Sequence, residues 1–196
     1  MARDDWYRRT TWSDRDREEF NARLKRSRGD FHKAQYLRIQ AFHLSQVGLH
    51  TAAIELVDRL LAEFPVDFEM ASAHQQKTES LAKFGRTAEA IDEYRASLES
   101  ERKYPGFRTS AWLGFAWLVA DERLTDLYDE VLGVLDEFYR QHSPLTFPVD
   151  AYRFWAVKSV IADFKDERAA AEEFARSALA ERQESIPDTD IMPRWG

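Results

Sequence analysis

The residues of this sequence that could do chemistry are its histidines and its many carboxylates. The histidines are His32, His43, His50, His74 and His142. No two of them are four residues apart, as the two histidines of a zinc-binding HExxH helix must be. His43 and His50 fall on a predicted helix and on the turn after it, where we expect polar or half-buried side chains rather than metal ligands. Glycine-rich phosphate loops and a G-x-S-x-G nucleophile elbow are absent. The sequence therefore predicts no catalytic residues, no cofactor and no metal site.

Acidic residues are clustered in places, for example at Asp121-Glu122 and at Asp126, Asp129 and Glu130. On helical surfaces such carboxylates are usually solvated. A folded cleft could still assemble a catalytic pair from residues that are distant in the sequence. A helical enzyme without a sequence motif therefore remains an alternative.

Length and composition favour one compact domain covering residues 1–196. With 196 residues, of which 44% are hydrophobic, folding should bury roughly 70% of the surface that the unfolded chain exposes. No linker rich in Gly, Ser or Pro interrupts the chain.

Charge and cysteine content narrow the expected location and partners. The absence of cysteine excludes a disulfide framework and fits a reducing compartment, so we expect a cytoplasmic protein. The N-terminus has no apolar region typical of a secretory signal, and the longest apolar run, Trp112–Ala120, is too short to span a membrane. The net charge of −7 argues against nucleic acid as the main partner.

The elements that must position any binding residues are helices, and the stretch Ala34–Pro65 defines their arrangement. Apolar and small residues recur there every three or four positions, which predicts one helix up to Gly48 and a second helix after it. Gly48 can adopt the left-handed conformation that closes a helix. Thr51 can cap the second helix, and Pro65 ends it. Ala53 is small, which allows two helices to approach closely.

The same phrase returns later in the chain. Gly85 lies 37 residues after Gly48, and Ala90 lies 37 residues after Ala53. A fixed period of this size indicates stacked units. The pattern of Leu37, Ala41, Leu44, Gly48, Ala53, Val57 and Pro65 resembles the tetratricopeptide repeat (TPR). The resemblance implies an all-α fold of antiparallel helical hairpins stacked as a right-handed TPR-like α-solenoid.

The rest of the chain can be divided on this basis. Residues 1–30 form a capping segment, in which Ser13 caps a helix and Trp6, Tyr7 and Trp12 pack on the first repeat. Residues 31–184 form four helical hairpins: Ala34–Pro65, Asp67–Lys103, Thr109–Gln141 and Val149–Glu184. Asp67 and Thr87 are expected caps, Asp166 replaces the turn glycine of the last hairpin, and Phe147 is expected to be buried. Residues 185–196 form a tail whose Ile186, Ile191, Met192 and Trp195 either fold back or bind a partner.

The first helix of each TPR hairpin lines a concave groove, and the resemblance therefore implies a binding surface. The residues predicted to line it are Gln35, Arg38, Phe42, Gln75, Glu79, Arg108, Phe115 and Arg153. One TPR subgroup grips the carboxylate at the end of chaperone tails with Lys and Asn. Phe42 and Glu79 stand here at the two Asn positions, which argues against that type of clamp. Phe115 could instead be a core residue.

These observations predict a non-catalytic scaffold that binds a protein or peptide of unknown identity, without nucleic acid or membrane. Arg38 can pair with a carboxylate, and Phe42 can supply a flat apolar contact beside it. We therefore expect a ligand with an acidic group and an apolar anchor.

The first alternative to this binding function is a homo-oligomeric assembly module. Phrases near the start, Asp4–Trp12 and Lys33–Ala41, are similar to bacterial helical-repeat proteins, which implies no activity.

Overall fold

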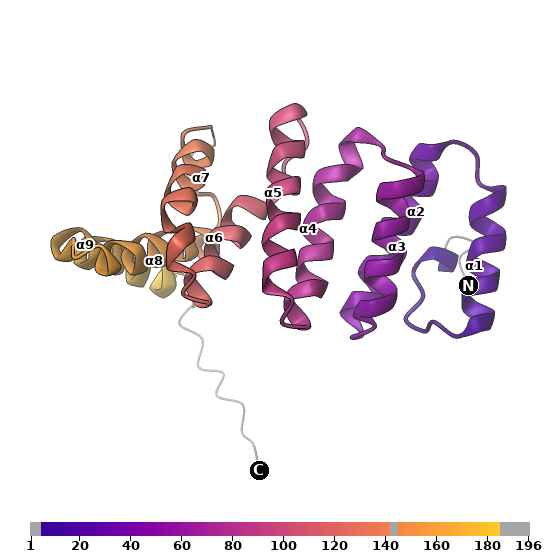
Figure 1. The fold of residues 1–196 in the computed structure, drawn as a ribbon, viewed down its shortest axis with the longest axis horizontal. Coiled ribbons are helices and arrows are strands. Elements are labelled where there is room, and N and C mark those ends of the chain that lie inside the picture. Colours follow the sequence, from indigo (N-terminus) through magenta and orange to yellow (C-terminus); the bar gives the residue numbers. More distant parts are fainter. Residues whose placement is uncertain (1–4, 142–144, 185–196) are drawn as a thin grey trace, which may run out of the picture. The chain divides into compact units, whose positions relative to one another are not determined.

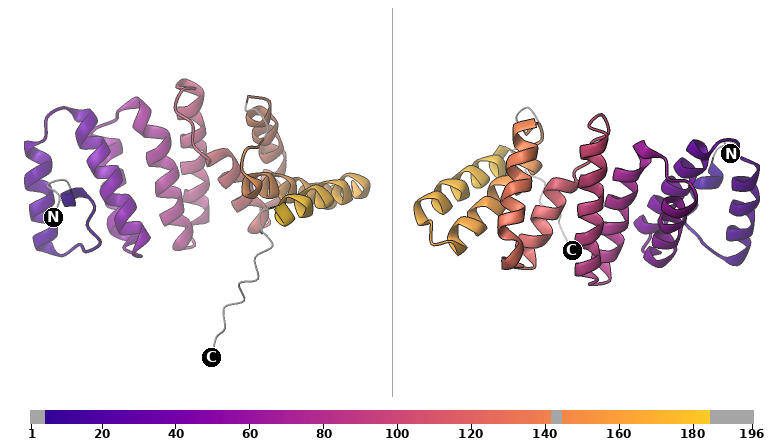
Figure 2. Two further views of the ribbon diagram at one scale, coloured as in Figure 1. Left: turned by 180° about the vertical axis from the view of Figure 1, so that it is seen from behind. Right: turned by 45° about the horizontal axis from the view of Figure 1, so that its top comes forward.

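The computed structural model describes residues 5–141 and 145–184, and every regular element in these residues is a helix. The all-α prediction is therefore confirmed (Figures 1 and 2). The four residues named in the predicted tail lie outside the described residues. The α-helices are α1 (Asp14–Arg26), α2 (Asp30–Gln46), α3 (His50–Glu63), α4 (Asp67–Lys83), α5 (Thr87–Lys103), α6 (Ala111–Asp121), α7 (Tyr128–Gln141), α8 (Pro148–Phe164) and α9 (Arg168–Glu184).

The chain divides into two compact units, Met1–Ala111 and Trp112–Gly196. The sequence suggested a single domain because it contains no visible linker. No linker marks the boundary between the two units, because the boundary lies directly after Ala111, the first residue of α6. Each unit is described separately.

In the first unit, helices that are adjacent in the sequence pack against each other: α2 on α3, α3 on α4, and α4 on α5 (Figure 1). The core is built from the apolar stripes that the periodicity predicted. Leu37, Leu44 and Leu60 are completely buried. The α4–α5 pair begins at Asp67 and ends at Lys103, as the repeat pattern predicted.

Ala53 and Ala90 are buried within their helix pairs, with 2% and 0% of their surface exposed. The backbone carbonyl of Ala90 accepts a hydrogen bond of 3.4 Å from the Thr78 hydroxyl of α4, which shows how closely α5 approaches. Neither site has room for a longer side chain.

Replacing either alanine with leucine should lower the free energy of unfolding by roughly 1–3 kcal/mol, because the added atoms overpack the contact. Urea unfolding followed by circular dichroism measures the change. Ala62→Leu, on the exposed face of α3, is the matched control and should have almost no effect. If Ala53→Leu and Ala90→Leu were as stable as this control, the helices would not pair through these positions.

Four helix–helix turns share one hydrogen-bond pattern. After α2, the N–H of Leu49 donates to the carbonyl of Leu44 at 2.9 Å and that of Gly48 donates to Ser45 at 3.0 Å. This is a Schellman motif, in which the turn residue has a positive φ. The equivalent turns after α4, α6 and α8 place Gly85, Arg123 and Asp166 at that position. The sequence predicted Gly48, Gly85 and Asp166 there, but not Arg123.

The predicted caps are right for α1 and wrong for three other helices. The Ser13 hydroxyl accepts from the N–H of Asp16, which forms a capping box. Thr51, Asp67 and Thr87, in contrast, lie inside the first turns of α3, α4 and α5. In α3 and α5 the last residue of the preceding Schellman motif also serves as the cap, so α3 begins one residue before Thr51 and α5 begins at Thr87 itself.

The aromatic rings near the N-terminus pack on the first unit, as predicted. Trp6 lies 5.3 Å from Phe20 of α1 and 4.9 Å from Tyr36 of α2, measured between ring centroids. Trp12 lies 5.4 Å from Phe20. These rings join the N-terminal segment to both helices.

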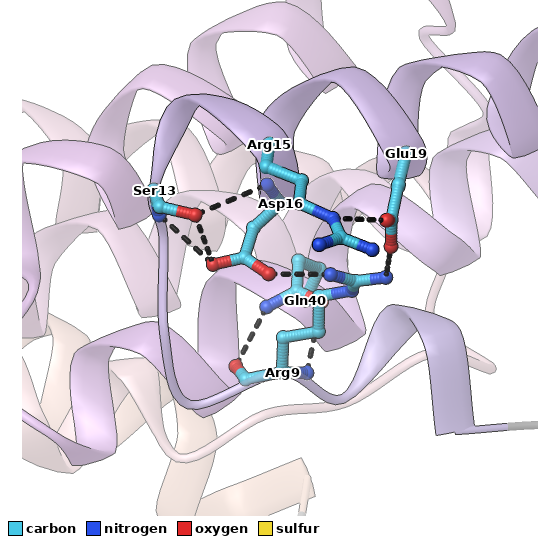
Figure 3. A network of polar contacts seen from close by, with 6 residues as sticks. All are labelled: Arg9, Ser13, Arg15, Asp16, Glu19 and Gln40. Carbon is cyan, nitrogen blue, oxygen red and sulfur yellow. Dashed lines mark hydrogen bonds and ion pairs between the residues drawn. The ribbon is translucent and has the colours of Figure 1, made fainter.

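A polar network secures the same segment (Figure 3). The guanidinium of Arg9 pairs with Asp16 and Glu19 of α1, while its backbone N–H and carbonyl pair with the side-chain amide of Gln40 on α2. Gln40 is completely buried, and both ends of its amide are satisfied. Hydrogen bonds from the backbone and hydroxyl of Ser13, and from Arg9, hold the pKa of the Asp16 carboxyl well below its usual range.

The second unit contains α6 to α9, with α8 and α9 packed along each other (Figure 2). A short 3-10 helix, Thr125–Leu127, separates α6 from α7. Asp126 lies in this 3-10 helix, where the repeat pattern would place a small helical residue. The prediction that Phe147 is buried is wrong, since 64% of its surface is exposed. Its position just before α8 places it at the end of a loop rather than in the core.

Candidate functional site

The predicted groove residues are distributed over both units. In the first unit, α2 carries Gln35, Arg38 and Phe42, and α4 carries Gln75 and Glu79. Helices α2 and α4 contact each other. Gln75 and Glu79 lie 37 residues after Arg38 and Phe42, so they hold the same places on the second helix. We call the surface formed by these residues the α2–α4 face.

Arg38 is occupied by a contact within the protein. Its Nε donates to the carboxylate of Glu69 on α4, and Glu69 is buried, with 4% of its surface exposed. The expectation that Arg38 binds an acidic ligand group is therefore not supported by its environment, because the guanidinium already neutralises a buried acid. Sequence alone could not reveal this, since the two residues lie 31 positions apart.

Two other predicted polar residues also make internal hydrogen bonds. The side-chain amide of Gln75 donates to the Ser110 hydroxyl at 2.8 Å. Arg108 donates to the carbonyl of Pro105 at 3.1 Å while remaining exposed. The first contact joins the segment after α5 to α4, and the second lies within that segment.

Phe42 and Glu79 are the exposed residues among those predicted on the α2–α4 face, whereas Gln35, Arg38 and Gln75 are half-buried. Phe42 is 44% exposed. One turn further along α2, Ser45 and Gln46 lie on the same side of the helix as Phe42. They border a hollow of about 450 Å³. The complete lining of this hollow is Ser45, Gln46, Gly48, His50, Glu79, Ser80 and Lys83.

The electrostatics of this hollow centre on Glu79. Its side chain is accessible to solvent, yet the surrounding protein raises the pKa of its carboxyl through partial burial. Among the described residues, no cation forms an ion pair with it. An unpaired and partly desolvated carboxylate attracts a cationic group, because pairing would offset the loss of hydration.

A serine and a histidine meet in the same hollow. Nδ1 of His50 lies 3.4 Å from the Ser80 hydroxyl oxygen, which is a pairing that nucleophilic enzymes use. Ser80, however, is 99% buried on α4, with 1% of its surface exposed. A ligand in the hollow would therefore reach His50 and Glu79 before the serine oxygen, and the arrangement is better suited to binding than to acyl transfer.

A second polar cluster joins three helices on another side of α4. Lys77 pairs at 2.6 Å with Asp58 of α3 and at 2.6 Å with Glu93 of α5, and Nδ1 of His74 lies 2.6 Å from Glu93. Burial opposes ionisation of Glu93, but the hydrogen bonds from His74 and Lys77 outweigh it and lower the pKa of its carboxyl. All four side chains are paired, so the cluster holds the helices together.

The two predicted residues of the second unit have different environments. Phe115 is completely buried, and its ring belongs to the core rather than to a binding surface. Periodicity alone could not decide this, since core and groove positions alternate on the same helix. Arg153 is exposed, with its guanidinium 5.7 Å from the ring centroid of Trp117.

One candidate surface was missed by the sequence reasoning. The rings of Phe31, Phe68 and Phe107 form a row in the first unit, with centroids 4.6 Å and 5.3 Å apart. Phe31 and Phe107 are 38% and 47% exposed. The signal was present, because Phe68 follows Phe31 by 37 residues, which is the repeat period.

No group of three His, Asp or Glu side chains within residues 5–141 and 145–184 could hold a metal ion. Within the same residues, every helix is too short or too polar to cross a membrane.

Comparisons of the chain with protein-family models, curated proteins and solved structures found no match.

Proposed function

We propose that this protein is a non-catalytic scaffold that binds a peptide segment of another protein on the α2–α4 face of its first unit. The observation that carries the proposal is the exposed ring of Phe42, which lies one helical turn before two residues of the hollow that contains the unpaired carboxylate of Glu79. The TPR-like sequence phrases and the shared turn geometry support a repeat scaffold of stacked hairpins, in which such a face binds ligands.

The ligand chemistry follows from these two side chains. An apolar side chain of the peptide would pack on Phe42, and a Lys or Arg side chain would pair with Glu79. The net charge of −7 would also favour the approach of a basic segment. This chemistry replaces the acidic ligand expected from the sequence, because Arg38 already pairs with Glu69.

A photo-crosslinking amino acid at position 42 tests the proposal in a lysate of the source organism. A crosslinker at the exposed position of Leu179 on α9 is the control. We expect a protein that is captured from position 42 and not from position 179. Capture of the same proteins from both positions would contradict the proposal.

Binding of the captured partner should then depend on both side chains. Phe42→Ala should weaken it about tenfold or more, which corresponds to about 1.4 kcal/mol, and Glu79→Gln should weaken it as well. Leu179→Ala and Glu55→Gln, both at exposed positions, should not change the affinity for the partner. An equal loss of affinity in these control variants would exclude the α2–α4 face.

In the wild type, affinity for the partner should fall as pH drops through the raised pKa of Glu79, because the protonated acid no longer attracts a cation.

Self-association is a second candidate function, and the aromatic row of Phe31, Phe68 and Phe107 favours it. Exposed aromatic rings that lie together are typical of protein interfaces. A photo-crosslinking amino acid at the exposed position 107 that captured another copy of this chain would support assembly over partner binding.

A further inference from the structure

The second unit contains a cavity that is separate from the α2–α4 face. It has a volume of about 350 Å³, which is in the range of small-molecule sites. Residues of α6 and of the turn after it form one side, and residues of α8 form the other. The lining consists of Trp117, Ala120, Asp121, Arg123, Tyr152, Ala156, Val157 and Val160.

The walls of this cavity are suited to a flat apolar group. The ring centroids of Trp117 and Tyr152 lie 6.2 Å apart. Alanine and valine side chains complete the lining, so a ring-sized group would meet carbon atoms on several sides. Aromatic rings prefer such offset or edge-to-face neighbours.

One guanidinium and one carboxylate line the cavity, and a second guanidinium lies beside it. Arg123 lines it, and the guanidinium of Arg153 lies over the Trp117 ring at its side. Among the described residues, neither arginine forms an ion pair. Asp121 is the one carboxylate in the lining. The charges of the lining itself balance, and the neighbouring guanidinium of Arg153 adds the positive charge that favours an anionic group on the ligand, since guanidinium and carboxylate can share two hydrogen bonds.

The backbone of Arg123 adopts an energetically disfavoured conformation. Its φ of +53° lies in the left-handed region, where a side chain with a Cβ is disfavoured. Gly48 and Gly85 take the corresponding turns in the first unit. A glycine would be the more stable residue for the turn alone, so a role for the arginine side chain would explain its presence.

We propose that this cavity binds a small aromatic carboxylate. Its ring would contact Trp117 and Tyr152, and its carboxylate would pair with Arg123 and Arg153. The proposal is independent of the peptide-binding function, because it concerns the other unit and a different class of ligand.

Three indole compounds that share a two-carbon linker but differ in charge test the ligand chemistry on the full chain by isothermal titration calorimetry. Indole-3-propionate carries the predicted anion, indole-3-propionamide is neutral, and tryptamine is a cation. We expect indole-3-propionate to bind with a Kd of about 1 mM or below and the other two to bind at least tenfold more weakly. Equal binding of all three, or no binding of the acid, would overturn the proposal. A tripeptide ending in tryptophan, compared with its amide, then shows whether the acid can be a peptide terminus.

Arg123→Gly separates the structural role of this residue from its binding role. The substitution should raise the melting temperature by roughly 2–4 °C, because it relieves the disfavoured backbone. It should also weaken indole-3-propionate binding at least fivefold. Asp166→Gly is the matched control, since it relieves the equivalent turn after α8, where φ is +63°. It should raise the melting temperature without changing the affinity. If Arg123→Gly left the affinity unchanged, Arg123 would be no part of a binding site and the proposal would fail.

Discussion

Replacing Arg38 with alanine should lower the free energy of unfolding by about 3 kcal/mol, which is one of the two largest effects we expect. The substitution removes the partner of Glu69 and leaves a carboxylate in a site that is 4% exposed. Breaking a buried ion pair on one side costs about 3–5 kcal/mol, because the remaining charge loses its compensation. The lower end applies here, since the side chain of Arg38 is itself 29% exposed.

Urea unfolding followed by circular dichroism measures this effect, and two further variants identify its cause. The double variant Arg38→Met/Glu69→Gln should recover most of the loss, because no buried charge remains. Arg86→Ala removes an exposed pair with Glu89 and should have a far smaller effect, because solvent screens exposed pairs. A stable Arg38→Ala protein that no longer binds its partner would show that Arg38 contacts the ligand after all.

The Arg38–Glu69 pair also shows where sequence reasoning reached its limit. The repeat phase correctly placed Arg38 and Phe42 on one helix, because helical periodicity is a local property. Whether such a side chain meets a ligand or a neighbouring helix depends on residues far along the chain. Arg59 is a similar case: it looks like a plain surface residue, yet it donates to Asn21 of α1 at 2.6 Å.

Some of the turns between helices could be predicted from the sequence and others could not. The ends of α2 and α4 could be predicted because glycine is the residue that most readily adopts a positive φ, and Gly48 and Gly85 are both present. Arg123 has the same backbone conformation without that signal, so its turn and the 3-10 helix after it were not foreseen. The cavity of the second unit was missed for this reason, although Arg153 at its side was predicted.

Phe20→Ala should lower the free energy of unfolding by about 4 kcal/mol, because truncation of a buried phenylalanine removes transferred surface and leaves a cavity. Phe20 is completely buried and contacts both Trp6 and Trp12. It is one of two buried residues on α1, together with Leu24. A helix that is attached through so few residues depends strongly on each of them.

Hydrogen exchange should locate the damage in α1 and in the N-terminal segment, where protection should fall far more than in α4 and α5. Phe20→Leu keeps much of the volume and should restore part of the stability. Phe31→Ala is the matched control, because this phenylalanine is 38% exposed and its loss should cost under about 1 kcal/mol. If Phe20→Ala and Phe31→Ala were equally mild, the Arg9–Gln40 network rather than the aromatic core would hold α1 in place.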